Sequence, residues 1–175
     1  MYIGIDQSYG GCGLAFLDDQ GELISSTVLD KHTADYKSMV DIANQIVDVL
    51  RKARLSDDVQ VAIEHTGFGH RSSSRYSMQV ALTGAIIYGL INIGIEPRII
   101  HVQQWKSDVM NNRLRKMKKA TKAQKKEYLQ VVMSETGYLF ETPDEADAFC
   151  IAEKLRRQQK KGGSKCQSKT NSVSA

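Results

Sequence analysis

Cysteine is scarce in this sequence, and its arrangement excludes two kinds of small scaffold. Only Cys12, Cys150 and Cys166 occur, and no two of them have the CxxC spacing. An odd number of widely separated cysteines argues against a disulfide framework and against a zinc site. The composition instead fits a protein that works in a reducing cytosol.

Long apolar runs and a signal-like beginning are also missing. No stretch approaches the ~20 apolar residues of a membrane-spanning helix, and the first residues lack the basic, apolar and small-residue pattern of a secretion signal. We therefore expect a cytoplasmic protein with no membrane partner. A chain of 175 residues, 41% hydrophobic and 25% charged, is long enough for one domain with a proper core.

Charge is unevenly distributed along the chain, although the net charge is only +4. Residues 1–100 hold eight Lys and Arg against twelve Asp and Glu, whereas residues 101–175 hold sixteen against eight. A basic half joined to a mildly acidic half indicates a polyanionic partner.

The first 30 residues predict an antiparallel meander of three strands. MYIGID (1–6), GLAFLD (13–18) and ELISSTVL (22–29) alternate or are apolar, and a glycine-rich turn (10–13) and a hairpin turn (18–21) separate them. Asp6 ends the first strand. Such a carboxylate either caps a turn or points into a site above the edge of the sheet.

A second strand-end carboxylate follows one helix later. Residues 35–54 carry apolar side chains at helical spacing, and VQVAIEH (59–65) is a β-branched run that contains Glu64. A strand that returns through a helix is most easily parallel to the first strand. Since parallel strands end at the same edge, Asp6 and Glu64 are expected to be neighbours.

The next two segments have open interpretations. Residues 65–77 predict a polar, basic loop in which Phe68 either packs under the loop or stacks on nucleic acid, with Arg71 and Arg75 as basic neighbours. Residues 74–94 predict an apolar helix with small residues. Such a helix is either an internal core helix or is covered on one side by a second copy of the chain.

A strand at 96–102 leads into the most basic part of the chain. Trp105 and Lys106 stand together, and residues 113–126 then contain eight basic and no acidic residues before helical spacing resumes at Tyr128. A charge run is often only a solvated face. This density favours binding of a polyanion, with a strong dependence on salt. The basic residues singled out are Lys106, Arg113, Arg115, Lys116, Lys118 and Lys119.

The last predicted helix, within 142–161, carries a pair of carboxylates. Thr142 is the expected N-cap, and Asp144 and Asp147 share one face of the helix start. Acids at a helix start complement the helix dipole, which explains Asp144. It explains Asp147 less well, because Asp147 lies among apolar residues, where a carboxylate is costly to bury without a partner. From Gly162 onward no apolar pattern remains, so residues 159–175 are expected to form a disordered basic tail.

Asp6, Glu64, Asp144 and Asp147 are therefore candidates for a single site. Four clustered carboxylates repel one another unless cations lie between them. Oxygen ligands without His or Cys select Mg²⁺, with Mn²⁺ as a substitute. Two such ions ~3.5–4 Å apart support hydrolysis of phosphodiesters.

Three motifs, IGIDQSYGGCGLAF, VAIEHTGF and PDEADAFCIA, together resemble the RuvC family of Holliday junction resolvases over residues 1–158. The resemblance implies an α/β, RNase H-like fold: a five-stranded mixed sheet, with three antiparallel N-terminal strands plus two parallel ones, flanked by helices. It also implies a homodimer with two metal-dependent sites that nick opposed strands of branched DNA, leaving 5′-phosphate and 3′-hydroxyl ends.

The resemblance also assigns residues. Asp6, Glu64, Asp144 and Asp147 match the family's catalytic and metal-binding carboxylates. Phe68 lies near the family's junction aromatic, Lys106 and one of Lys116, Lys118 and Lys119 near its basic residues, and 74–94 at its dimer helix. Asp6-Gln7-Ser8 departs from the usual Asp-Pro-Gly. This departure, the dense basic run and the tail are compatible with a bacteriophage member acting in the bacterial cytoplasm.

Three other functions share parts of these patterns. Another RNase H-like nuclease, acting on RNA–DNA hybrids or RNA, needs the same carboxylates. An actin-like or sugar-kinase-like ATP-binding domain has a similar first loop, but it needs two domains, so we expect no nucleotide cofactor. A non-catalytic architectural DNA-binding protein explains the basic run but not the four acids.

Overall fold

A computed structural model gives the fold and describes residues 1–8, 11–30, 35–54, 58–65, 74–114, 116–119 and 121–167. Strands and helices alternate along most of the chain. Their order and bounds are β1 (Tyr2–Gln7), β2 (Gly11–Leu17), β3 (Leu23–Asp30), α1 (Tyr36–Arg54), β4 (Gln60–Glu64), α2 (Ser74–Asn92), β5 (Arg98–Ile100), α3 (Val102–Asp108), α4 (Lys122–Thr136) and α5 (Pro143–Gln167).

The five strands form one mixed sheet in the order β3-β2-β1-β4-β5. β1 pairs with β2 and β2 with β3 in antiparallel fashion, whereas β1–β4 and β4–β5 are parallel pairs. The predicted sheet is therefore confirmed. The parallel strands β1, β4 and β5 end at the same edge, where Asp6 and Glu64 lie.

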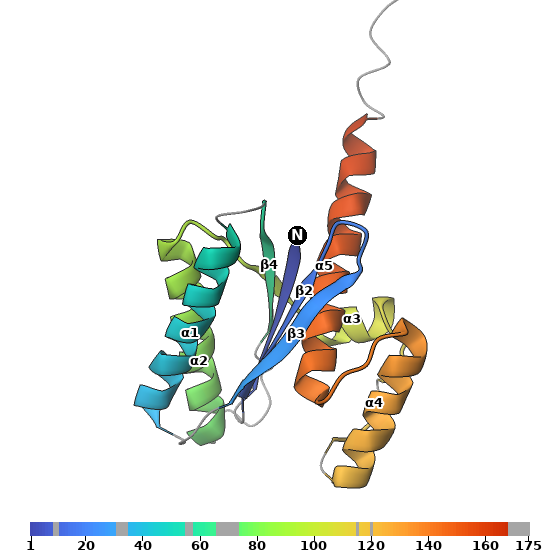
Figure 1. Ribbon diagram of the computed structural model, residues 1–175, viewed down its shortest axis with the longest axis horizontal. Helices are drawn as coiled ribbons and strands as arrows, with labels where there is room; N and C mark the ends of the chain where they lie inside the picture. The colour runs from blue at the N-terminus through green and yellow to red at the C-terminus, as the bar shows by residue number, and fades with distance from the viewer. Residues whose placement is uncertain are drawn as a thin grey trace, which may run out of the picture.

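Helices cover both faces of the sheet, and each face has its own apolar core. α1 and α2 lie on one side, and α5, with α3 and α4 beside it, lies on the other (Figure 1). On β1, Ile3 and Ile5 point toward α1 and α2. The residues between them point toward α5, because side chains alternate along a strand. Asp6 therefore belongs to the α5 face.

One face of helix α2 is buried and the other is exposed, although its sequence is apolar almost throughout. Leu82, Ile86 and Leu90 are fully buried against the sheet and α1, whereas Tyr88 and Ile91 are 70% and 55% exposed. The interpretation as a purely internal core helix is therefore wrong. Among the described helices, none is both long and apolar enough to cross a membrane.

Some predicted elements differ from the structure. Gly11, expected in a turn, belongs to β2, which starts two residues before the predicted strand (13–18), and the short helix α3 was not predicted. α5 continues as a helix to Gln167, nine residues into the segment 159–175 predicted to be a tail. Residues 168–175 lie outside the described part of the chain.

Candidate active site

The ends of two parallel strands bring the first two carboxylates together. Ile5 on β1 is in register with Ile63 on β4, so the following residues, Asp6 and Glu64, occupy neighbouring positions. Their carboxyl groups form a hydrogen bond. The amide of Gln7 donates to the backbone carbonyl of Glu64 at 2.5 Å, and that of Gln79 on α2 donates to the carbonyl of Gln7 at 3.1 Å. These bonds fix the two strand ends.

Small residues on the sheet let α5 approach and deliver the other two carboxylates. A Cβ atom at Gly13 would lie 2.1 Å from the carbonyl oxygen of Asp144, and one at Gly4 would lie 2.0 Å from that of Ala148. Both distances are far shorter than a van der Waals contact. The first turns of α5 therefore rest directly on β1 and β2, next to Asp6.

We expect Gly13→Ala to destabilise the protein, by about 1–3 kcal/mol, because the methyl group forces the backbone of α5 away. Urea unfolding at one low protein concentration measures the change. Gly84→Ala on α2, measured at the same low concentration so that contacts between copies do not contribute, is the matched control, since a Cβ there meets nothing within 4 Å in the same chain. Alanine in a helix should leave stability unchanged or raise it slightly. Equal effects at the two positions would contradict the close approach of α5.

The three acidic residues at the start of α5 have different roles: Glu145 caps the helix, whereas Asp144 and Asp147 line the cavity. Thr142 Oγ1 accepts from the backbone N–H of Glu145 at 3.2 Å, and Glu145 Oε2 accepts from the N–H groups of Glu141 and Thr142 at 2.9 and 3.0 Å. This arrangement is a capping box. Thr142 is thus the N-cap, as predicted, and Glu145 serves the helix end, while Asp144 and Asp147 line the neighbouring cavity.

All four predicted carboxylates line one cavity of about 950 Å³ at this edge of the sheet. Lysines from α3, from the segment before α4 and from α4 itself also line it, as does a fifth acid, Glu141. The predicted acids of this site are Asp6, Glu64, Asp144 and Asp147, and the lysines are Lys106, Lys119, Lys122, Lys125 and Lys126. We call the four predicted carboxylates the acidic floor of this cavity and the five lysines its basic rim.

Burial makes the acidic floor electrostatically costly. Asp6 is only 5% exposed. Its burial, followed by the negative charges of Asp147 and Glu64, raises the pKa of Asp6 well above its ordinary value. Burial likewise raises the pKa of Glu64. Additional positive charge in the cavity would relieve this cost.

Asp147 already has two partners. Tyr128 on α4 donates its hydroxyl proton to Oδ1 of Asp147, and Lys119 donates from Nζ to Oδ2. Burial tends to lower the pKa of Lys119, but the charges of Asp147 and Asp6 outweigh it and raise that pKa. Lys119 is therefore a cation inside the site, and it is the member of the predicted group of three lysines that the structure places there.

The other predicted DNA-binding residues have different positions. Lys106 lines the cavity, with Nζ 5.2 Å from the centre of the Trp105 ring. Arg113 forms an exposed ion pair with Glu135. Lys116 and Lys118 line a separate cavity of about 420 Å³. Three residues, Phe68, Arg71 and Arg115, lie outside the described residues, and Arg75 is placed only as part of the first turn of α2.

Several lining residues were not singled out from the sequence. Lys122, Lys125 and Lys126 belong to the basic run, but the run alone does not show that they face one cavity. Their spacing of three and four residues places them on one face of a helix. The capping box of Thr121 and Gln124, which starts α4, was the available signal. Tyr128 was treated only as an apolar helix position. Its role as a partner of Asp147 depends on the packing of α4 against α5.

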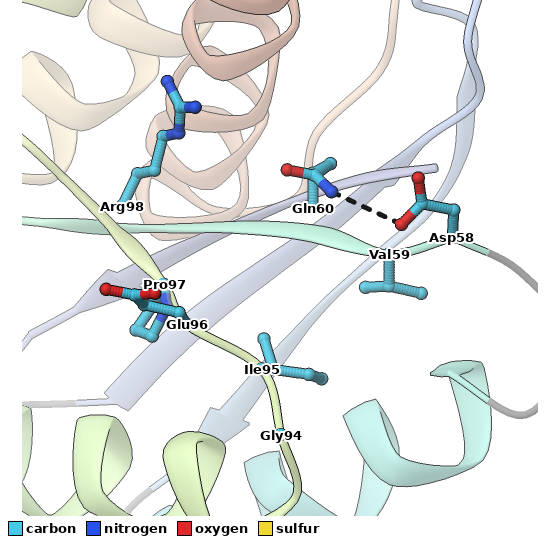
Figure 2. A pocket seen from close by; sticks show the side chains of 8 residues that line it. All are labelled: Asp58, Val59, Gln60, Gly94, Ile95, Glu96, Pro97 and Arg98. Atoms are coloured by element: carbon cyan, nitrogen blue, oxygen red, sulfur yellow. Dashed lines mark hydrogen bonds between the residues drawn. The ribbon is translucent and has the colours of Figure 1, made fainter.

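A second cavity lies at the opposite edge of the sheet. It has a volume of about 690 Å³ and is formed by the chain entering β4 and β5. Figure 2 shows its lining, in which the amide of Gln60 donates to Asp58 at 3.4 Å while Arg98 points away from both. Its mixed charges do not converge on one point, so the acidic cavity remains the candidate site.

The four carboxylates are the kind of ligand that a hard divalent cation prefers, since all of them supply oxygen atoms. Within the described ranges, however, no three His, Cys, Asp or Glu side chains lie close enough together to hold a metal ion. Lys119 occupies one oxygen of Asp147 instead. Binding of a cation therefore requires side chains to rearrange.

Two solved structures resemble the chain over most of its length. Thermus thermophilus RuvC is 20% identical, with a TM-score of 0.66, and the match covers 91% of this chain and 95% of that one. The chain has the RuvC fold. T. thermophilus RuvC in complex with Holliday junction substrate matches with the same identity and TM-score, over 91% and 94% of the two chains.

The RuvC fold is a five-stranded form of the RNase H-like architecture, so the predicted fold class is confirmed. No model of a known protein family matches the sequence, and neither does any curated protein. The likeness at 20% identity is one of fold. Function must therefore be argued from the cavity itself.

Proposed function

We propose that this protein is a Mg²⁺-dependent, structure-selective DNA endonuclease that resolves Holliday junctions and other branched DNA. The observation that carries the proposal is the convergence of Asp6, Glu64, Asp144 and Asp147 in one lysine-rimmed cavity. The RuvC fold supports it, as one of the similar structures contains a Holliday junction.

The four carboxylates would hold two Mg²⁺ ions, with Mn²⁺ as a substitute. The raised pKa of Asp6 and of Glu64 supports this assignment, because a buried acidic cluster needs positive charge. Two bound ions would activate a water molecule and stabilise the oxygen that leaves from the phosphodiester. Asp6 is held by β1 and by its hydrogen bond to Glu64, so it would present its carboxylate to the ions in a fixed position at the base of the cavity.

The lysines of the rim would bind the backbone of the DNA strand to be cut. Lys122, Lys125 and Lys126 extend from the first turns of α4, and Lys106 faces the same cavity from α3. Together they can place a phosphate group over the acidic floor. Ammonium groups bind phosphate without regard to sequence and release counterions, so binding should weaken steeply with salt.

A homodimer would supply two such sites for two opposed strands. The outer face of α2 supports this assembly, because Val80, Tyr88 and Ile91 are exposed apolar residues at helical spacing. Gly84 lies on the same stripe and has open space around it. A second copy of α2 is therefore the proposed partner of this face.

A nicking assay on a synthetic four-way junction tests the function. With Mg²⁺ we expect paired nicks confined to the junction, ending in 5′-phosphate and 3′-hydroxyl, and no cutting of linear duplex. Removing the cation with a chelator should abolish cutting, and Mn²⁺ should restore it, because the bound ions would activate the attacking water.

The same assay distinguishes the alternatives. Cutting of an RNA–DNA hybrid instead of the junction would assign the site to ribonuclease activity. Tight junction binding with no cutting under any divalent cation would contradict the nuclease proposal and favour an architectural role.

A further inference from the structure

Both carboxylate oxygens of Asp147 have a partner from another element. Oδ1 accepts from the Tyr128 hydroxyl, and Oδ2 accepts from Lys119 Nζ. The carboxylate is only 3% exposed, so these two bonds replace most of its solvation. The two partners differ in how easily each can be exchanged.

Tyr128 is a fixed partner. It is fully buried on α4 and packs in the apolar core with Val132 and Phe149, beneath α5. Its hydroxyl donates to Oδ1 of Asp147 from within this core. Moving this side chain would require repacking of the core.

Lys119 is an exchangeable partner. Its side chain is 30% exposed and lines the cavity, with Nζ 4.9 Å from the centre of the Tyr128 ring. A lysine carries its charge on a flexible four-carbon stem. It can therefore leave Asp147 for a phosphate group without any change in the core.

We propose that Tyr128 is a positioning residue of the acidic site. It holds Oδ1 of Asp147, so that Oδ2, now paired with Lys119, is the oxygen that Asp147 offers to a divalent cation. This inference rests on the proposed nuclease function. It adds a residue that does not contact the cation but fixes the orientation of one that does.

The expected consequence is a loss of cation affinity when the hydroxyl group is removed. A carboxylate that has lost its outer partner can rotate and can no longer present one oxygen in a fixed direction. Loss of such partners typically lowers metal affinity or activity by about 10–100-fold. The ring, and with it the core packing, stays in Tyr128→Phe.

Thermal melts of the full-length chain without DNA, over a series of Mn²⁺ concentrations, provide the test. We expect Tyr128→Phe to raise the half-saturating Mn²⁺ concentration by about 10–100-fold. Tyr138→Phe is the matched control, because its hydroxyl donates to Glu22 at 2.5 Å outside the cavity. That variant should keep the parent's half-saturating concentration.

Junction nicking separates positioning from a general loss of structure. Tyr128→Phe should cut slowly at low Mn²⁺ and recover toward the parent's rate as the concentration rises. Lys119→Met gives a change of opposite sign in the melts, since the cation no longer competes with the ammonium group for Oδ2. Its half-saturating concentration should fall, and this result does not depend on the stability of Tyr128→Phe.

Each contrary result has a distinct meaning. A half-saturating concentration for Tyr128→Phe within about twofold of the parent's would overturn the positioning role, given the 10–100-fold expectation. An unchanged or higher value for Lys119→Met would overturn the assignment of Oδ2. A parent protein whose melting does not respond to any divalent cation would overturn the proposed nuclease site, and this inference with it.

Discussion

We expect Asp6→Asn to abolish strand cutting while junction binding survives. Asn has the shape of Asp but lacks the negative charge that would hold a cation at the base of the cavity. Loss of one electrostatic group in an active site can lower the rate by about 10²–10³-fold, and we expect at least such a loss here. Single-turnover nicking of a four-way junction in Mg²⁺, with a gel-shift assay in parallel, measures both properties.

Asp41→Asn is the matched control for this variant. Asp41 lies on the exposed side of α1, on the opposite face of the sheet from α5. The substitution is the same, and it should leave nicking unchanged. Cutting by Asp6→Asn at the parent's rate would contradict the role of this cavity.

Asp6→Asn should also be more stable than the parent at neutral and higher pH. Because burial and the charges of Asp147 and Glu64 raise the pKa of Asp6, the folded protein binds this proton more tightly than the unfolded chain does. The protonated Asp6 side chain therefore stabilises the parent most below the pKa that Asp6 has in the unfolded chain. This stabilisation is lost as the pH rises through the pKa that Asp6 has in the folded protein. In a chelator, Asp6→Asn should melt above the parent near neutral pH, and the difference should shrink toward about pH 4.

The position of the acidic floor could be predicted because it depends on local patterns and one topological rule. Asp6 is the penultimate residue of β1 and Glu64 is the last residue of β4, and parallel strands end at one edge. Asp144 and Asp147 follow a recognisable N-cap at a spacing that places both on one helix face. These signals need no knowledge of distant contacts.

The closeness of α5 to the sheet could not be predicted, because it depends on contacts across more than a hundred residues. Gly13 was placed where a glycine-rich turn meets the next strand, and no sequence pattern indicates that it lies under Asp144. The helix α3 was missed for a similar reason. It is only seven residues long, and Trp105 within it is fully buried in the core on the α5 face.

The basic run shows the same limit at the level of single side chains. Composition predicts that residues 113–126 contact a polyanion, but it cannot rank Lys116, Lys118 and Lys119. The path of the chain before α4 places Lys119 on Asp147 and leaves the other two outside the cavity. Charge density therefore predicts the partner, and the tertiary structure selects the residue.

We expect Ile91→Asp to separate the proposed dimer and to uncouple the two nicks. Ile91 is 55% exposed on the outer face of α2, and an aspartate at an apolar interface would have to be buried without a partner. Loss of a hot-spot contact costs about 2 kcal/mol or more, which weakens association by at least ~30-fold. Sedimentation across a concentration series measures this, and nicking of a junction labelled on opposed strands measures coupling.

Leu139→Asp is the matched control, because Leu139 is 82% exposed and follows α4, outside α2. It places the same charge on an exposed apolar position and should leave both measurements unchanged. A dimer that persists in Ile91→Asp would place the contact on another surface.

A monomeric parent that still makes paired nicks would contradict the coupling itself, because one acidic cavity can hold only one scissile phosphate at a time. Single, unpaired nicks from Ile91→Asp monomers are the expected result. Each chain carries its four carboxylates within one cavity, so separation removes the second cut and leaves the first.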